Sequence, residues 1–182
     1  MAYVAQEWKT RIPENMNPLS PSGFKFLINK LPKMHFYCQT VNLPGIILGE
    51  PEYATPFSNI PIPGEKLSFG DLTLQFLVDE TLENYQSIQR WLFGLGFPKE
   101  YSQYIDFINS DTITAGPNSE LSRNYSDASL FILTNNNTGS KLLSFKNVFP
   151  TSLESLTFTG IDNDIQYLVG QVTFKYSYYD FE

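Results

Sequence analysis

The chain has 182 residues, 15% of them aromatic, and a formal net charge of −7 at pH 7. A chain of this length favours a single domain, which buries about 70% of its unfolded surface and needs no metal or disulfide to stay folded. Twelve basic residues stand against nineteen acidic ones, and no basic stripe is visible. This balance argues against tight binding of nucleic acid, which requires clustered positive charge.

Cysteine usage and apolar runs indicate the environment of the chain. Cys38 is the only cysteine, so an internal disulfide is excluded and a reducing compartment is expected. No apolar run reaches the roughly 18 residues of a membrane span, and residues 1–20 lack the apolar core of a signal peptide. Neither membrane insertion nor export is therefore expected.

The first third of the chain is predicted to be extended and irregular. Residues 1–22 are rich in proline and asparagine, which interrupt regular elements, and are expected to form an arm. Apolar and polar residues alternate over 24–29, and residues 34–38 are predicted to return as the second strand of a hairpin. Residues 46–68 contain four prolines. We expect an irregular ribbon there, with a turn at 63–64, in place of a central strand.

Residues 69–95 hold the strongest structural pattern, an alternating strand followed by an acidic turn and an amphipathic helix. The strand buries one face because successive side chains point to opposite sides. Thr81 is expected to cap the helix, whose acidic first turn suits the helix dipole, and Gly94 and Gly96 supply its stop signals. The predicted buried residues are Leu72, Leu74, Phe76 and Val78 on the strand, and Tyr85, Ile88, Trp91, Leu92 and Leu95 on the helix.

The C-terminal half is predicted to be mostly strands. After a weak helical pattern at 101–108, strands are expected at 129–134, 141–148, 153–158 and 165–178. Asparagine and glycine favour a hairpin turn at 135–139, and residues 162–164 favour another. One face of the last strand carries Tyr167, Val169, Gln171, Thr173, Lys175 and Ser177 and is mostly polar, while Leu168, Val172, Phe174, Tyr176 and Tyr178 share the other face, which is expected to be buried.

Residue types that usually perform chemistry are sparse. His35 is the only histidine, and it is expected on a strand where Cys38, three residues on, points to the opposite face. The two therefore form no local dyad, and a histidine-based metal site is excluded.

Other candidate motifs have simpler structural explanations. The acidic pairs within 79–80 and 162–164 fit a helix start and a turn better than paired catalytic acids or a calcium loop. The glycines within 63–66 and 94–96 are too sparse to cradle a phosphate. No catalytic, cofactor-binding or metal-binding residue is predicted, and no cofactor is expected.

Short motifs follow one another in a specific order over residues 24–96 and 141–181. They are Leu43-Pro44-Gly45, Gly64-Glu65-Lys66, Phe69, Leu72, Asp79-Glu80, Trp91, Phe149-Pro150-Thr151, Leu156, Asp162-Asn163-Asp164-Ile165-Gln166, Val172, Phe174 and Tyr176. This order resembles the tail tube family of contractile-tailed bacteriophages, including the tube initiators that join the tube to the baseplate.

The resemblance implies an antiparallel β-sandwich or barrel with one flanking helix at about 81–95. It also implies hexameric rings that stack into a tube for DNA passage, in the virion, after assembly in the host cytoplasm. Sheath or baseplate proteins would be its other partners. Six copies would carry six times the charge of one chain, so DNA is expected to slide past the ring without adhering. The polar face of the last strand suits a water-filled channel wall.

Domain organisation follows from the same reading. Residues 1–22 are the arm, and residues 23–182 form one domain with an inserted segment at 97–124. Because the arm and the insert lie outside the resemblance, a tube initiator or terminator remains an alternative to a tube subunit.

Two alternatives belong to other classes of protein. A monomeric β-sandwich could bind carbohydrate through surface aromatics such as Tyr101, Tyr104, Tyr178 and Tyr179. A hydrolase would need two acids about 5–10 Å apart in one cleft, which sequence spacing does not indicate.

Overall fold

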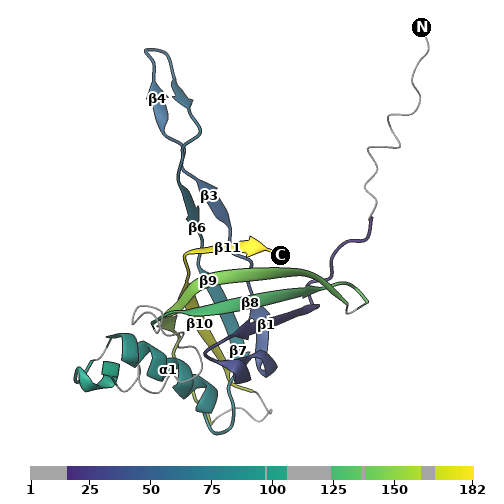
Figure 1. The fold of residues 1–182 in the computed structure, drawn as a ribbon, viewed down its shortest axis with the longest axis vertical. Coiled ribbons are helices and arrows are strands. Elements are labelled where there is room, and N and C mark those ends of the chain that lie inside the picture. Colours follow the sequence, from purple (N-terminus) through teal and green to yellow (C-terminus); the bar gives the residue numbers. More distant parts are fainter. Residues whose placement is uncertain (1–15, 97, 106–123, 137, 161–166) are drawn as a thin grey trace.

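The computed structural model describes residues 16–96, 98–105, 124–136, 138–160 and 167–182 (Figure 1). This part of the chain is mainly antiparallel β-sheet with one long α-helix, as the sequence predicts. The elements are β1 (Phe24–Ile28), the 3-10 helix η2 (Pro32–Phe36), β2 (Cys38–Val41), β3 (Ile46–Leu48), β4 (Glu52–Ala54), β5 (Asn59–Pro61), β6 (Leu67–Phe69), β7 (Leu72–Leu77), α1 (Glu83–Gly96), β8 (Ser126–Leu133), β9 (Gly139–Leu153), β10 (Val169–Lys175) and β11 (Tyr178–Phe181).

Seven strands form one antiparallel sheet in the order β1-β8-β9-β10-β7-β2, with β11 also paired to β9. The long strand β9 belongs to two layers. Its first part pairs with β8 as far as Val148 and with β11, and its last part pairs with β10 from Phe149 onward. We call β1, β8, β11 and the first part of β9 the β1 layer, and β2, β7, β10 and the last part of β9 the β2 layer.

Side chains of both layers meet in a single core, which makes the domain a sandwich. Phe26 and Phe145 come from the β1 layer, and Phe76 and Phe174 come from the β2 layer; all four are almost fully buried. Helix α1 covers one side of the sandwich (Figure 1) and adds Ile88 and Trp91 to the core. The other residues with no exposed area are Ile28, Leu72, Leu74, Ala128, Leu143, Val148 and Val172.

The predicted strand and helix at 69–95 are confirmed. Leu72, Leu74 and Phe76 are fully buried, and the Trp91 ring packs 6.2 Å from that of Phe174. The predicted start of the helix is wrong, because α1 begins at Glu83 and not after Thr81.

The chain enters α1 through a turn that Asn84 organises. Its buried Oδ1 accepts from the Asp79 backbone N–H at 3.2 Å, and its Nδ2 donates to the Leu77 carbonyl at 2.8 Å. Leu82 adopts a positive φ of 58°, which interrupts the helical path before Glu83. The hydroxyl of Thr81 donates to Asp79 at 2.9 Å and leaves the helix N–H groups to other acceptors.

The predicted hairpin between 24–29 and 34–38 is wrong. The strand is present as β1, but it pairs with β8, which lies about a hundred residues further along the chain. Pro32 begins η2 instead, which is consistent with its fixed φ at a helix start. Leu31 and Met34 are buried there, so the segment fills the corner between β1 and β2.

The predicted C-terminal strands are present with different limits. The turn at 135–139 joins β8 to β9, as expected. Strand β9 continues to Leu153 without the predicted break, and residues 154–158 are not a strand. The predicted strand at 165–178 is divided into β10 and β11, with Val172 and Phe174 buried as predicted. The predicted burial of Tyr178 is wrong, because this residue begins β11 and is 45% exposed. The predicted turn at 162–164 lies outside the described residues.

Candidate assembly surfaces

The most prominent surface is a β-hairpin that projects from the body (Figure 1). It consists of the ladders β3–β6 and β4–β5, which extend the pairing of β2 with β7 beyond the sheet. The prediction of an irregular ribbon at 46–68 is therefore wrong, and the turn lies at 55–58, where Thr55 bonds Ser58, and not at 63–64. The strands are three residues long, which is compatible with the many prolines.

The hairpin exposes large apolar side chains. Directly paired residues lie on one face of a ladder, so Ile46, Leu48 and Leu67 share a face with Phe69. Phe57 at the tip is 98% exposed. The other exposed apolar residues of the hairpin are Ile47, Tyr53, Ile60 and Ile62. Large exposed apolar surfaces of this kind are typical of sites where proteins associate.

Two joints interrupt the ribbon. At the lower joint, residues 42–45 and 70–71, Asn42 Oδ1 accepts from the Thr73 N–H at 2.6 Å and Asn42 Nδ2 donates to the Asp71 carbonyl at 2.9 Å. At the upper joint, residues 49–51 and 62–66, Gly64 donates its N–H to the Gly49 carbonyl at 2.7 Å. A Cβ on Gly64 would overlap that carbonyl oxygen, so the close approach requires glycine.

The second surface is the outer face of the β2 layer, which we call the polar face. Gln75 pairs with Gln171 across β7 and β10, and their side-chain amides bond at 3.0 Å. The same face carries an ion pair between Lys175 and Asp71, which are each about half exposed. Its remaining polar members are Thr40, Thr73, Ser152 and Thr173. The strand polarity that the sequence predicts is thus confirmed for Gln171, Thr173 and Lys175.

The third surface consists of strand edges. Strand β2 ends the sheet, and its outer edge pairs with no strand in the described part of the chain. Residues 149–153 of β9 pair with β10 alone among the described strands. These two edges are opposite borders of the β2 layer. Unpaired edges are templates for strand addition by another chain.

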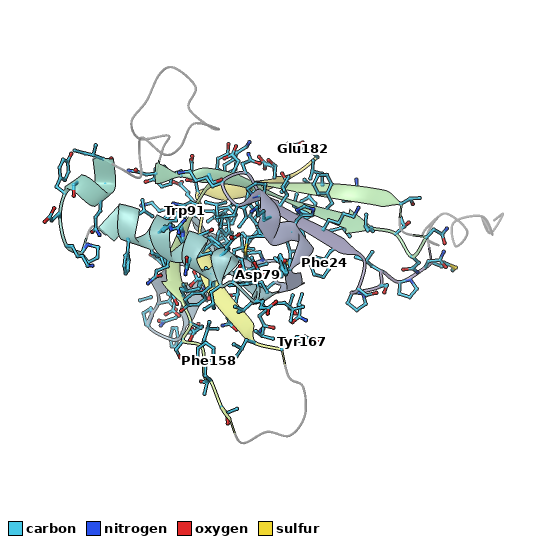
Figure 2. The ribbon with its side chains drawn as sticks, turned by 90° about the horizontal axis from the view of Figure 1, so that it is seen from below. Phe24, Asp79, Trp91, Phe158, Tyr167 and Glu182 are labelled. Atoms are coloured by element: carbon cyan, nitrogen blue, oxygen red, sulfur yellow. The ribbon has the colours of Figure 1, made fainter. Side chains whose placement is uncertain are left out.

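The fourth surface lies at the end of the body away from the hairpin. The hairpin joins β7 at Leu72, whereas Val169 pairs with Leu77 at the other end of that strand. Val169 and its neighbour Tyr167 are 46% and 78% exposed. Figure 2 shows Tyr167 and Phe158, which is also largely exposed, on the same side of the body.

The residues considered for chemistry are not brought together. His35 lies in η2 and not in the expected strand, with Nδ1 2.6 Å from the Pro32 carbonyl. Cys38 is half-buried in β2, and this burial raises its pKa to about 11, which makes it a weak nucleophile. Asp79 takes part in the turn before α1. Within the described segments, no group of three histidine, cysteine or acidic residues is placed to hold a metal ion.

Tyr101 and Tyr104 form a partly exposed ring pair with centroids 5.7 Å apart. They lie in a short helical segment whose continuation beyond residue 105 is outside the described residues. No helix among the described residues is long and apolar enough to cross a membrane.

No family model matches the chain, and no curated protein matches it by sequence. Solved structures share its fold. A chain of the PVC sheath-tube complex, an extracellular contractile injection system in its extended state, aligns with a TM-score of 0.56 and 18% identity over 92% of this chain and 93% of that one. Two further neighbours come from the anti-feeding prophage. Its baseplate gives a TM-score of 0.57 and 12% identity over 92% and 97% of the two chains, and its tube-terminating cap gives 0.57 and 18% over 100% and 99%.

At these identities the likeness establishes the fold. The domain is a mainly antiparallel β fold of the tail-tube type, and the sandwich with one flanking helix that the sequence predicts is confirmed. Sequence reasoning missed the projecting hairpin. The signal lies in the apolar residues between the prolines of 46–68, but prolines usually interrupt strands and therefore conceal the pattern.

Proposed function

We propose that the protein is a structural subunit of the tube of a contractile tail or injection machine and has no enzymatic role. Its copies would form six-membered rings that stack into a hollow cylinder through which DNA passes, as in a bacteriophage virion. Sheath and baseplate proteins would contact the outside and the end of this cylinder. The observation that carries the proposal is the pair of exposed apolar surfaces at opposite ends of the body.

Different apolar surfaces at two ends favour head-to-tail contact. A contact between unlike patches that lie at opposite ends of the body adds each copy along one direction, so it can propagate as a stack. The hairpin with Phe57 at its tip supplies one patch, and Tyr167 with Val169 supplies the other. Exposed apolar residues at both ends therefore support the role of a subunit that contacts one ring on each side.

The ring is supported by the two edges of the β2 layer. Joining the β2 edge of one copy to residues 149–153 of the next would continue the sheet around a closed ring and remove both open edges. The polar face would then line the interior, where amides and hydroxyls are compatible with water. The formal net charge of −7 belongs to the whole chain and does not describe this face, because the acid Asp71 is paired with Lys175 there.

A tube terminator or initiator is the second candidate. The chain of the tube-terminating cap aligns over the whole chain with a TM-score like that of the chain of the sheath-tube complex, so fold alone does not separate the roles. A terminator needs only one stacking surface, whereas a tube subunit needs two.

Electron microscopy of the purified protein over a concentration series tests the proposal. A tube subunit is expected to give long cylinders above a threshold concentration, and a terminator or initiator is expected to stop at single or double rings. Protein that stays monomeric at all concentrations would contradict both roles.

A matched pair of variants tests which surface stacks the rings. Phe57→Ser removes the apolar tip of the hairpin, and Phe131→Ser removes an exposed apolar residue of β8 in the body. We expect the first to abolish cylinders and leave rings, and the second to assemble normally. Equal assembly by both would count against the hairpin as the stacking element.

A further inference from the structure

A segment from the far end of the chain holds the hairpin at its base. Tyr179 in β11 donates its hydroxyl to the Pro44 carbonyl at 3.1 Å, across 135 positions of sequence. Its ring also packs edge-on against Phe69, with centroids 5.8 Å apart. Pro44 precedes β3 and Phe69 ends β6, so one side chain touches both arms of the hairpin.

Tyr179 is itself fixed in the β1 layer. Its backbone pairs with Phe145 of β9, and its ring lies 5.4 Å from the ring of that buried residue. The ring of Phe181, on the same strand, lies 6.0 Å away, and the ring of Tyr176, in the connection between β10 and β11, lies 6.1 Å away. The side chain therefore has a rigid support that is not part of the hairpin.

The hydrogen bonds of Asn42 restrain the base of the hairpin in a different way. Asn42 bonds Thr73 and Asp71, all three of which belong to the same β2–β7 ribbon as the hairpin. These bonds hold the two arms of the ribbon together, but they do not tie the ribbon to the β1 layer. Tyr179 makes that second connection through a hydrogen bond and a ring contact, and Tyr176 adds a ring contact with Phe69 at 6.0 Å.

We infer that Tyr179 is a positioning residue that sets the direction in which the hairpin projects. The inference rests on the proposed function in one respect, because the hairpin is taken as the element that docks on the next ring. About eleven extended residues separate the base from the tip, a reach of about 35 Å. A swing of about 10° at the base would therefore move Phe57 by about 6 Å, enough to take it out of a pocket built for its ring.

The direction of the hairpin is measurable in dispersed protein. Spin labels at Ser58→Cys near the tip and at Lys141→Cys in β9, in a Cys38→Ala background, report the distance from hairpin to body by pulsed electron paramagnetic resonance. The variants are Tyr179→Phe, which removes the hydroxyl, and Tyr179→Leu, which also removes the ring. Tyr178→Leu is the matched control, since Tyr178 is the exposed neighbour whose side chain points to the other face of β11.

We expect Tyr179→Leu to broaden the distance distribution about twofold and to raise the concentration at which cylinders form about tenfold, because a hydrogen bond and aromatic contacts are lost together. Tyr179→Phe should lie between this variant and the parent, and Tyr178→Leu should match the parent. The circular dichroism spectrum should stay unchanged throughout.

An unchanged distance distribution in Tyr179→Leu would overturn the inference. If that variant does not fold, Tyr179→Phe decides the question, and a distribution identical to the parent again overturns it. If the parent forms no cylinders, the proposed function fails, while the distances in dispersed protein still decide whether Tyr179 sets the hairpin direction.

Discussion

Gln75 and Gln171 face each other across β7 and β10, and the Nε2 of Gln75 donates to the Oε1 of Gln171 at 3.0 Å. This amide pair lies at the centre of the polar face, with the Thr73–Thr173 pair on one side and the Leu77–Val169 pair on the other. The face thus changes from charged at the hairpin end, through neutral polar groups, to apolar at the far end. In a stacked cylinder this order would place the apolar end against the next ring.

The polar face is expected to become inaccessible from outside when cylinders form. In a Cys38→Ala background, Thr173→Cys places a thiol on this face, and Gln89→Cys places one on the exposed side of α1. Both should react with a small maleimide in dispersed protein and in cylinders. With a large polymer-linked maleimide, the thiol at 173 should lose its reactivity on assembly, while that at 89 should keep it. If assembly lowered the reactivity of both thiols equally, or of neither thiol, the polar face would not line the interior.

Removal of the Tyr176 hydroxyl is expected to stabilise the protein. The Tyr176 Oη is buried, and no described residue is within hydrogen-bonding reach of it. Removing an unpaired buried donor relieves a desolvation cost, so Tyr176→Phe should raise the free energy of unfolding by up to about 1 kcal/mol at pH 7. Tyr179→Phe is the matched control, because it loses the bond to Pro44 and should lower that free energy by about 1 kcal/mol. Urea titrations of both variants measure the difference.

Alkaline pH is expected to destabilise the fold through Cys38. The pKa of the thiol is 9.0 in the unfolded chain, and burial raises this pKa to about 11 in the folded protein. Between these values the folded protein holds the proton more firmly, so unfolding releases it and stability falls as pH rises from 9 to 11. At pH 8, alkylation should be about 100-fold slower than for an ordinary thiol, in proportion to the thiolate fraction. Rapid alkylation of the folded protein at pH 8 would contradict this burial.

Local patterns predict the elements whose own signals lie close together in the sequence. The buried faces of β7 and α1 follow from period two and period 3.6, and the turn between β8 and β9 follows from asparagines and a glycine, which are typical turn residues. These signals lie within a few residues of each other.

Contacts between distant segments could not be predicted in this way. The strand at 24–28 has the correct alternation, but nothing in it shows that β8 is its partner. The polar face was visible on β10 alone, since the contributions of β2, β7 and β9 depend on register. The contact between Tyr179 and Pro44 depends on the path of the whole chain.

Asn147 is expected to be sensitive to branched side chains. It adopts a φ of 57° where β9 passes from one layer to the other, and Asp127 binds both its N–H, at 3.3 Å, and the Nζ of Lys146, at 2.9 Å. A β-branched residue is disfavoured at positive φ, so Asn147→Val should lower the free energy of unfolding by about 1–2 kcal/mol. Asn147→Gly should cost less, because only the bond from its amide to Ser177 is lost. Thermal unfolding of both variants tests this, and equal losses would show that backbone strain is not the cause.

Gly64→Ala is expected to change the backbone path of the hairpin without changing its apolar side chains. The new Cβ would overlap the Gly49 carbonyl oxygen and approach the Pro51 ring, so the upper joint must open, yet every apolar side chain of the hairpin is retained. Gly45→Ala is the matched control, because a Cβ there meets no atom within 4 Å. Both variants should unfold near the parent temperature, since the joints lie outside the core. Electron microscopy should show cylinders for Gly45→Ala and only rings for Gly64→Ala, because displaced apolar groups no longer reach the next ring. Normal cylinders from Gly64→Ala would mean that stacking depends on the apolar residues without depending on the path of the backbone.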